Sequence, residues 1–369
     1  LYGLRCLPWE GSPSDSRSSL LLKKLGNFVA VSFFAIIGTL PLALYYFNQV
    51  SIVGLLSNCI AVPIVGFLIL PLGMLAMLVL PISFPLALCV MQGNGLVVSI
   101  LLSAVSFFSG WPFAAIKTVT PSLFEIGLFY AMIVALLNIK RKPWVRIAVL
   151  PLLLVLILGD ALYWMGKRFW DQELRTTIID VGHGNATLLE LPRGACILVD
   201  GGGFFDHSFD VGRFVVAPFL WQKKIATIDY IVLSHPQADH LNGLLYIARN
   251  FNVREVWSNG QPGQMETYQT FLEILSEEDI PLVRLNRNST PKIINGVHLD
   301  VLHPPADFLS HAGSTPWSDP NNNSLVFKAS FGETAFLFPG DIEAEAEREL
   351  ALHAGNTLKS TILLAPHHG

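Results

Sequence analysis

The sequence predicts a multi-pass α-helical membrane domain followed by a soluble α/β domain that folds as a layered sandwich. Residues 25–116 contain no Asp, Glu, Lys, Arg or His, a stretch long enough for several membrane crossings. The charge then changes sign, because residues 1–170 carry 11 basic and 4 acidic groups whereas residues 171–369 carry 13 and 24. Beyond residue 175, long apolar blocks give way to short β-branched runs separated by Gly, Asn and Pro.

Composition also sets the expected domain limits. Residues 1–24 are expected to be a linker or a loop between helices, residues 25–165 the membrane domain, and residues 171–369 the soluble domain. Because the chain begins without Met and ends directly after two His, we expect a fragment whose soluble domain is truncated at its C-terminus. The Cys residues are scattered and form no Cys-x-x-Cys pair, which excludes a disulfide framework and a Cys-type zinc site.

The membrane domain is expected to cross the bilayer about five times, with about 20 residues in each span. Pro and Gly interrupt the first two spans, and residues 50–58 are interpreted as a re-entrant piece or a short interfacial helix. Broken helices persist at that depth only where protein or a water-filled cavity satisfies the backbone, which favours a pore or transporter-like bundle over a simple anchor. The expected spans are residues 28–46, 60–80, 86–108, 122–139 and 144–163.

Basic clusters predict the orientation of this domain. Lys23 and Lys24 precede the first span, and residues 140–142, which read Lys-Arg-Lys, fill the turn between the last two. If both clusters are cytoplasmic, five crossings place the soluble domain on the outer side of the membrane. Lys167 and Arg168 lie on that outer side and argue against this placement.

The soluble domain is predicted to combine runs of strands with intervening helices, which indicates a layered α/β sandwich. The expected strands are residues 176–181, 186–191, 196–200, 229–234, 253–257, 282–285, 292–302, 324–330 and 334–338, and the expected helices are residues 240–250, 266–278 and 342–354.

Metal-binding side chains are concentrated where the strand near residue 230 ends. Residues 234–240 read Ser-His-Pro-Gln-Ala-Asp-His, so His235, Asp239 and His240 share one loop at the start of a helix. This spacing suits side chains that converge on adjacent metal ions, whereas two polar loop histidines on the surface are the alternative interpretation. Gln237 stands where such a loop normally carries another His.

Two further strand ends carry similar groups. Asp341 follows the apolar run 335–340, and His367 and His368 follow the run 361–366, which we interpret as another buried strand. Each of these strand ends alone is only weak evidence for a metal ligand, since an Asp after Gly is most often a helix cap. Three strand ends that present His or Asp are, however, what a metal site between two sheets requires.

Two Gly-rich turns carry candidate supporting residues. Asp200 ends the apolar strand 197–199, and we interpret it either as a carboxylate that orients a metal-binding His or as an Asp that stabilises a tight turn. Residues 180–185 read Asp-Val-Gly-His-Gly-Asn, and His183 is the titratable group at the tip of that turn.

The order of these segments resembles the ComEC family of competence proteins, which carry DNA across the bacterial cytoplasmic membrane. The resemblance is carried by residues 180–185 and 234–240, by Leu-Val-Asp-Gly-Gly at residues 198–202, by Asn-Asn-Asn-Ser-Leu-Val at residues 321–326, by Pro-Gly-Asp ending at Asp341 and by Pro-His-His-Gly at residues 366–369. Residues 58–73 resemble the competence membrane domain of the same family. Members also have an N-terminal OB-like domain and further helices that this sequence does not contain.

The resemblance implies a metallo-β-lactamase-like domain with an αββα fold that holds two divalent ions, Mn or Zn, and hydrolyses nucleic acid beside a channel for single-stranded DNA. It implies a multi-pass protein of the bacterial inner membrane whose partners are single-stranded DNA, membrane lipid and other DNA-uptake proteins, with no small-molecule organic cofactor. The family's metal positions correspond to His235, Asp239, His240, Asp341 and His367 or His368. Asp180, Asp200 and Asn323 are expected to support these ligands.

The sequence departs from the family pattern at Gln237, where His is usual, at Asn185, where Asp is usual, and at His183, where Gln is usual. Because an amide oxygen is a poorer ligand than imidazole for zinc-like ions, we expect one tight metal and one that is weak or absent. His183 is a candidate to supply the missing imidazole, although coincidence is the alternative explanation.

In the expected mechanism, a water acidified by metal attacks a phosphodiester, and Asp239 or Asp341 acts as the catalytic residue that orients it. The acidic charge of residues 171–369 opposes independent nucleic-acid binding, so DNA would be delivered by another part of the protein or by a partner. Two alternatives stay open: a hydrolase-like domain that has lost catalysis and serves as a structural or docking module, and a membrane-tethered phosphodiesterase that acts on other substrates.

Overall fold

A computed structural model describes residues 17–111, 114–205, 209–263, 265–311 and 318–368. The chain divides into two compact units, residues 1–156 and 157–369, with the boundary inside a long apolar helix.

Four helices are long and apolar enough to cross a membrane: Lys23–Phe47, Gly54–Val79, Phe84–Ser109 and Val145–Phe169. They coincide with four of the five expected spans, and the fifth corresponds to a shorter apolar helix. Large apolar side chains of these helices, such as Phe67 and Met77, are 80% and 76% exposed, as lipid-facing residues are. The helices of this region are α1 Arg17–Phe47, α2 Gly54–Ile64, α3 Leu70–Val79, α4 Phe84–Ser109, α5 Leu123–Asn138 and α6 Leu150–Phe169.

Pro and Gly interrupt the first two membrane spans less than the sequence suggested. Pro63 lies inside α2 and cannot donate a backbone hydrogen bond, and a π-helical segment, Val65–Ile69, follows it and joins α2 to α3. A second π-helical segment, Val145–Val149, begins the span that α6 completes. Proline is therefore accommodated by a local change of helical pitch within a continuous span.

The interpretation of residues 50–58 was wrong. Strand β1, Gln49–Ser51, pairs antiparallel with β2, Ala115–Lys117, and α2 begins at Gly54 as part of a full span. The physical reason is that the two loops carry extended, β-branched residues that satisfy each other's backbone groups, so that this stretch forms neither a re-entrant piece nor an interfacial helix.

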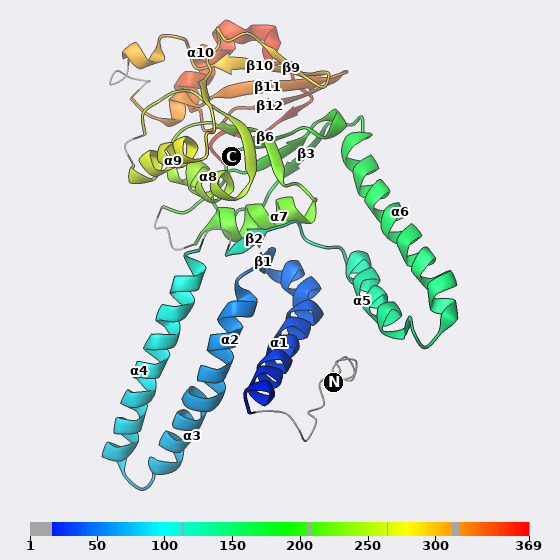
Figure 1. The fold of residues 1–369 in the computed structure, drawn as a ribbon. Coiled ribbons are helices and arrows are strands. Elements are labelled where there is room, and N and C mark those ends of the chain that lie inside the picture. The colour runs from blue at the N-terminus through cyan, green and yellow to red at the C-terminus, as the bar shows by residue number, and fades with distance from the viewer. Residues whose placement is uncertain (1–16, 112–113, 206–208, 264, 312–317, 369) are drawn as a thin grey trace. The chain divides into compact units, whose positions relative to one another are not determined.

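The described residues of the second unit form two β-sheets that are stacked face to face, with helices on the outer faces (Figure 1). The first sheet has the order β3-β4-β5-β6-β7-β8 and the second β13-β12-β11-β10-β9. The strands are β3 Arg175–Ile178, β4 Thr187–Glu190, β5 Cys196–Val199, β6 Thr227–Leu233, β7 Asn252–Ser258, β8 Leu282–Arg284, β9 Lys292–Ile294, β10 Val297–His303, β11 Val326–Phe331, β12 Thr334–Phe338 and β13 Ile362–Leu363.

The core lies between the two sheets. Residues such as Ile197, Val232 and Trp257 from the first sheet pack against Leu299 and Phe327 from the second. A smaller cluster packs α10 against the outer face of the second sheet, while α8 and α9 lie on the outer side of the first (Figure 1). The helices of this unit are α7 Ala217–Gln222, α8 Ala238–Asn250, α9 Glu266–Glu277 and α10 Ala344–Ala354. This is the αββα arrangement that was expected.

Three local expectations need correction. The expected strand 292–302 is a hairpin, β9 and β10, because Asn295 and Gly296 both have positive φ, 51° and 86°, and close a tight turn. Helix α7 and the π-helical segment before it, Gly212–Val216, were not predicted. The strand before His367 is not buried: Ile362 and Leu363 are 45% and 58% exposed, because β13 is an edge strand that pairs only with β12 among the described residues.

Candidate metal centre

The loop from β6 into α8 presents the first two candidate ligands. Strand β6 is buried between β5 and β7, and its apolar residues end at Leu233, so that His235 follows directly at the edge of the sheet. Helix α8 begins at Ala238, which places Asp239 and His240 in its first turn. The turn at 182–185 closes over this first turn, and a Cβ on Gly184 would lie 1.8 Å from the Asp239 carbonyl oxygen. Only Gly permits that approach.

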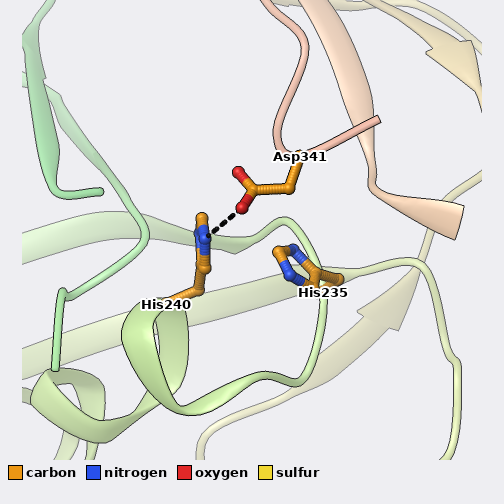
Figure 2. A group of neighbouring side chains, drawn as sticks. All are labelled: His235, His240 and Asp341. Atoms are coloured by element: carbon orange, nitrogen blue, oxygen red, sulfur yellow. Dashed lines mark ion pairs between the residues drawn. The ribbon is translucent and has the colours of Figure 1, made fainter. Parts of the chain in front are cut away.

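His235, His240 and Asp341 converge on one point (Figure 2). One potential ligand atom from each lies within 4.8 Å of the others, and all three residues are buried. His240 Nε2 is 3.1 Å from an oxygen of Asp341, which arrives from the loop after β12. The structure thus brings together, from two different sheets, three of the residues that the sequence predicted as metal ligands.

Asp200 fixes the orientation of the His240 ring. Its carboxylate lies 2.8 Å from His240 Nδ1 and accepts hydrogen bonds from the backbone N–H and the hydroxyl of Ser234, at 2.8 and 2.9 Å. The residue is 0% exposed and has a φ of 59°, an uncommon value that its Gly-rich surroundings maintain. With Nδ1 held by Asp200, His240 directs Nε2 towards Asp341.

Asp239 lies on the other side of the site, beside the turn that carries His183. Its carboxylate is 3.9 Å from His240 Nε2 and 3.8 Å from His183 Nε2. Asp239 is buried, whereas the side chain of His183 is 49% exposed at the rim. His183 therefore lies beside the Asp239 carboxylate, and its compensation for Gln237 at the His235 side stays a prediction.

Gln237 is engaged with a residue 84 positions away. Its side-chain N–H donates to the Asn321 side-chain oxygen at 2.6 Å. Asn321 begins a short 3₁₀ turn, Asn321–Asn323, whose residues are all buried. At the position where the family usually has His, this chain thus has a Gln whose carboxamide is hydrogen-bonded to the carboxamide of Asn321.

The remaining predicted residues surround this group or lie away from it. Asp180 is exposed and accepts a hydrogen bond from the Gly182 backbone N–H in its own turn. Asn323 is buried, and its side chain donates to the Asp319 carbonyl. His367 does not join the converging group, because its Nδ1 lies 3.5 Å from the Glu343 carboxylate and its side chain is 48% exposed. The side chain of His368 lies outside the described residues.

The two buried histidines differ in charge. Burial, together with the nearby His240, lowers the pKa of His235 to about 3, so its ring is neutral. Burial also opposes a charge on His240, but Asp200 and Asp341 outweigh it and raise the pKa of His240 to about 10. A cation that binds here would therefore replace the proton on His240 Nε2.

Sequence reasoning did not assign Ser234 and Ser324, which hold the His235 ring. The hydroxyls lie 3.0 and 3.3 Å from His235 Nδ1, and Ser324 also accepts a hydrogen bond from the Asp341 backbone N–H. Both Ser residues occur in the segments that carry the family resemblance, and a Ser beside a candidate ligand is the signal that would have identified them.

The donor set fits a divalent cation. His235 Nε2 is buried and has no hydrogen-bond partner among the described residues, which is costly unless another group satisfies it. Its Nδ1 is already held by the two hydroxyls, so the free nitrogen faces His240 and Asp341. Neutral imidazole and carboxylate are ligands that Zn and Mn accept.

Comparison with known protein families agrees with this reading of the two units. The family described as Competence protein matches residues 7–143, and the metallo-beta-lactamase superfamily matches residues 179–358. The second match confirms the predicted fold and implies divalent metal binding. It contains His235, His240 and Asp341 and ends before His367.

Curated relatives match across most of the chain. ComE operon protein 3 of Bacillus subtilis (strain 168) is 26% identical over 367 residues, which are 94% of this chain and 44% of that protein. Recombination protein 2 of Haemophilus influenzae is 26% identical over 351 residues, which are 89% of this chain and 41% of that protein. The chain thus spans less than half the length of these relatives.

Solved structures with similar folds include the metallo-beta-lactamase fold protein YhfI from Bacillus subtilis, with a TM-score of 0.29 and 10% identity over 46% of this chain and 63% of that one. Hydrolase AbOPH of the beta lactamase superfamily has a TM-score of 0.29 and 20% identity over 48% and 62%. At these scores neither likeness bears on activity. A region that matches the Competence protein family is thus followed by a region that matches the metallo-beta-lactamase superfamily, and across both regions the chain is similar to competence proteins of the ComEC type.

Proposed function

We propose that this protein takes part in the uptake of single-stranded DNA across the bacterial inner membrane and that its second unit is a metal-dependent phosphodiesterase. The proposal rests on the convergence of His235, His240 and Asp341, three buried ligands from two sheets, in a chain with four membrane-length helices. We further propose that the soluble unit faces the outer side of the membrane, as the basic clusters at residues 23–24 and 140–142 favour.

Each side chain has a distinct part in the proposed chemistry. When bound, a divalent Mn or Zn ion would polarise the phosphoryl oxygens of the substrate and acidify a water molecule. His235, His240 and Asp341 would hold that ion, and Asp200 would keep His240 in the required tautomer through its Nδ1. Asp239 is buried beside them, 3.9 Å from His240 Nε2, and would orient the attacking water. His367 or His368 remains a proposed additional ligand.

A row of aromatic rings beside the site supports single-stranded nucleic acid as the substrate. His183 stacks near Phe204, with ring centroids 6.3 Å apart, and Phe209 stacks on Phe214 at 5.3 Å. Phe205 and Phe214 are 59% and 55% exposed, and His183 reaches the Asp239 carboxylate at 3.8 Å. Unpaired bases stack on exposed rings of this kind, at about 1–3 kcal/mol for each base. The free energy of stacking would help to offset the electrostatic repulsion between DNA and the net acidic charge of residues 171–369.

The test is hydrolysis by the full chain in detergent, with three substrates: a single-stranded oligonucleotide, the same sequence as a duplex, and a small phosphodiester. We expect cleavage of the single strand to exceed that of the duplex by at least about 10-fold, because stacking requires unpaired bases. Chelation should abolish the activity, and Mn or Zn should restore it. Hydrolysis of the small phosphodiester alone would contradict the nucleic-acid proposal and support a phosphodiesterase for other substrates.

A specific observation favours the second candidate function, a domain that has lost full catalysis and serves for docking. Gln237 is tied to Asn321 by a 2.6 Å hydrogen bond, so one half of the expected two-metal site holds carboxamides where imidazole is usual. On this reading the unit keeps one ion for stability, and the membrane unit alone carries the transport role.

The exchange Gln237→His distinguishes these readings by metal content. We expect metal bound per chain to rise from one ion towards two, because imidazole is a better ligand than an amide for zinc-like ions. Metal analysis of dialysed protein measures this directly. Asn288→His, at an exposed position in a turn of the same unit, is the matched control for an added His, and an equal rise in both variants would mean surface binding.

A further inference from the structure

A cleft of about 210 Å³ lies where the last membrane-length helix ends, and none of the described candidate metal ligands lines it. It is formed by the C-terminal turns of α6, by the loop before β5 and by the turn after α7. Its lining includes Trp164, Lys167, Arg168, Ala195 and Lys224. All of these residues belong to the second unit.

Positive groups from separate segments converge in this cleft. Lys167 Nζ lies 5.1 Å and Lys224 Nζ 5.3 Å from the centre of the same Trp164 ring. Arg168 donates a hydrogen bond from Nη1 to the Lys224 carbonyl oxygen at 2.9 Å. Arg168 Nε is buried and has no hydrogen-bond partner among the described residues, so this donor is available to an anion.

The acidic residues that also line the cleft are engaged with other cations. Glu190 pairs with Lys223 at 2.5 Å, and Asp171 pairs with Arg175 at 2.6 Å. Within the described part of the chain, neither Lys167 nor Arg168 forms an ion pair with a carboxylate. The cleft therefore retains a local positive charge in a unit whose overall charge is negative.

The backbone holds the cleft in shape. A Cβ on Gly194 would lie 2.8 Å from the Arg168 carbonyl oxygen, and the Arg193 backbone N–H donates to the Asp171 carbonyl at 2.9 Å. Lys224 adopts a φ of 60°, which turns the chain back after α7. A site that is already formed loses little conformational entropy when a ligand binds.

We propose that this cleft binds the phosphate of an anionic phospholipid at the membrane surface. The position favours lipid over nucleic acid, because Trp164 and the 71% exposed Trp170 flank the end of a membrane-length helix, where aromatic and basic residues meet headgroups. The headgroup phosphate would accept hydrogen bonds from Lys167, Lys224 and Arg168. Bound lipid would join the end of α6 to the turn after α7, and this role is independent of hydrolysis at the metal centre.

The test is the retention of lipid by the full chain in detergent, counted by native mass spectrometry during titration with phosphatidylglycerol, phosphatidylcholine or a single-stranded 12-nucleotide DNA. We expect phosphatidylglycerol to be retained in preference to phosphatidylcholine. In the double variant Lys167→Gln/Lys224→Gln we expect its retention to weaken by about 30-fold, from the contribution of two basic residues at an anionic surface.

The matched control is Lys140→Gln/Lys142→Gln, which removes the same charge at the other end of the same span. Lys142 also lies over a Trp ring, 5.8 Å from that of Trp144, but it does not line this cleft. The control should retain phosphatidylglycerol, and both variants should keep the phosphodiesterase activity of unaltered protein. Equal loss of lipid in the two variants would overturn the proposal, as would a double variant that loses DNA binding while it keeps the lipid.

Discussion

Asp341→Asn is expected to lower metal-dependent hydrolysis by at least about 100-fold. Even the loss of a residue that only hydrogen-bonds to a metal ligand lowers metal affinity or activity by about 10- to 100-fold. Asp341 is 4% exposed, and its carboxylate lies 3.1 Å from His240 Nε2. It is the residue of the converging group that comes from the second sheet. Asn keeps the shape but removes the charge that a cation requires, so the metal should be lost together with the activity.

Two measurements separate this result from misfolding. Metal content per chain should fall in Asp341→Asn, whereas hydrogen exchange of the β11 amides should stay as slow as in the unaltered protein. Asp300→Asn, which makes the same change on β10 of the same sheet, should retain both metal and activity. Activity that persists in Asp341→Asn after the metal has been removed would rule out the proposed role of this residue.

Local patterns predicted the elements that carry the site. The apolar run of β6 and the polar loop after it identified His235 and His240, because a buried strand that ends in metal-binding residues is visible within one short stretch of sequence. Asp341 was predicted for the same reason at the end of β12. Their convergence follows from two sheets that pack face to face, which the alternation of strands and helices also indicated.

Contacts between distant segments were not predictable in this way. Gln237 and Asn321 meet because the 3₁₀ turn before β11 lies beside the start of α8, and no local pattern fixes that distance. The same holds for His367, whose φ of 50° directs it to Glu343, and for the exposure of β13, which depends on what covers an edge strand. Helix α7 was missed because Pro218 near its start and its short length obscure the helical period.

The register of the parallel pair β5 and β6 explains why Asp200 is central to the fold as well as to the site. Val199 pairs with Val232, so the residues that follow these strands, Asp200 and Ser234, lie side by side at the same sheet edge. The buried carboxylate accepts two hydrogen bonds from Ser234 and faces the positively charged His240. Its charge is thus compensated entirely by neighbours in the protein.

Asp200→Asn is expected to destabilise the second unit by about 3–5 kcal/mol, because it removes the buried carboxylate at Nδ1 of the buried, charged His240 and leaves only Asp341 at Nε2. Asn tolerates the positive φ of this position, so the effect comes from the lost charge and not from the backbone. Hydrogen exchange of the β6 amides in the full chain gives the free energy of opening. The control is Asp279→Asn, an exposed Asp that also has a positive φ, 53°, and it should change that free energy by less than about 0.5 kcal/mol. An equally small effect of Asp200→Asn would mean that His240 is neutral in the folded protein, and the ring would then be held by hydrogen bonding alone.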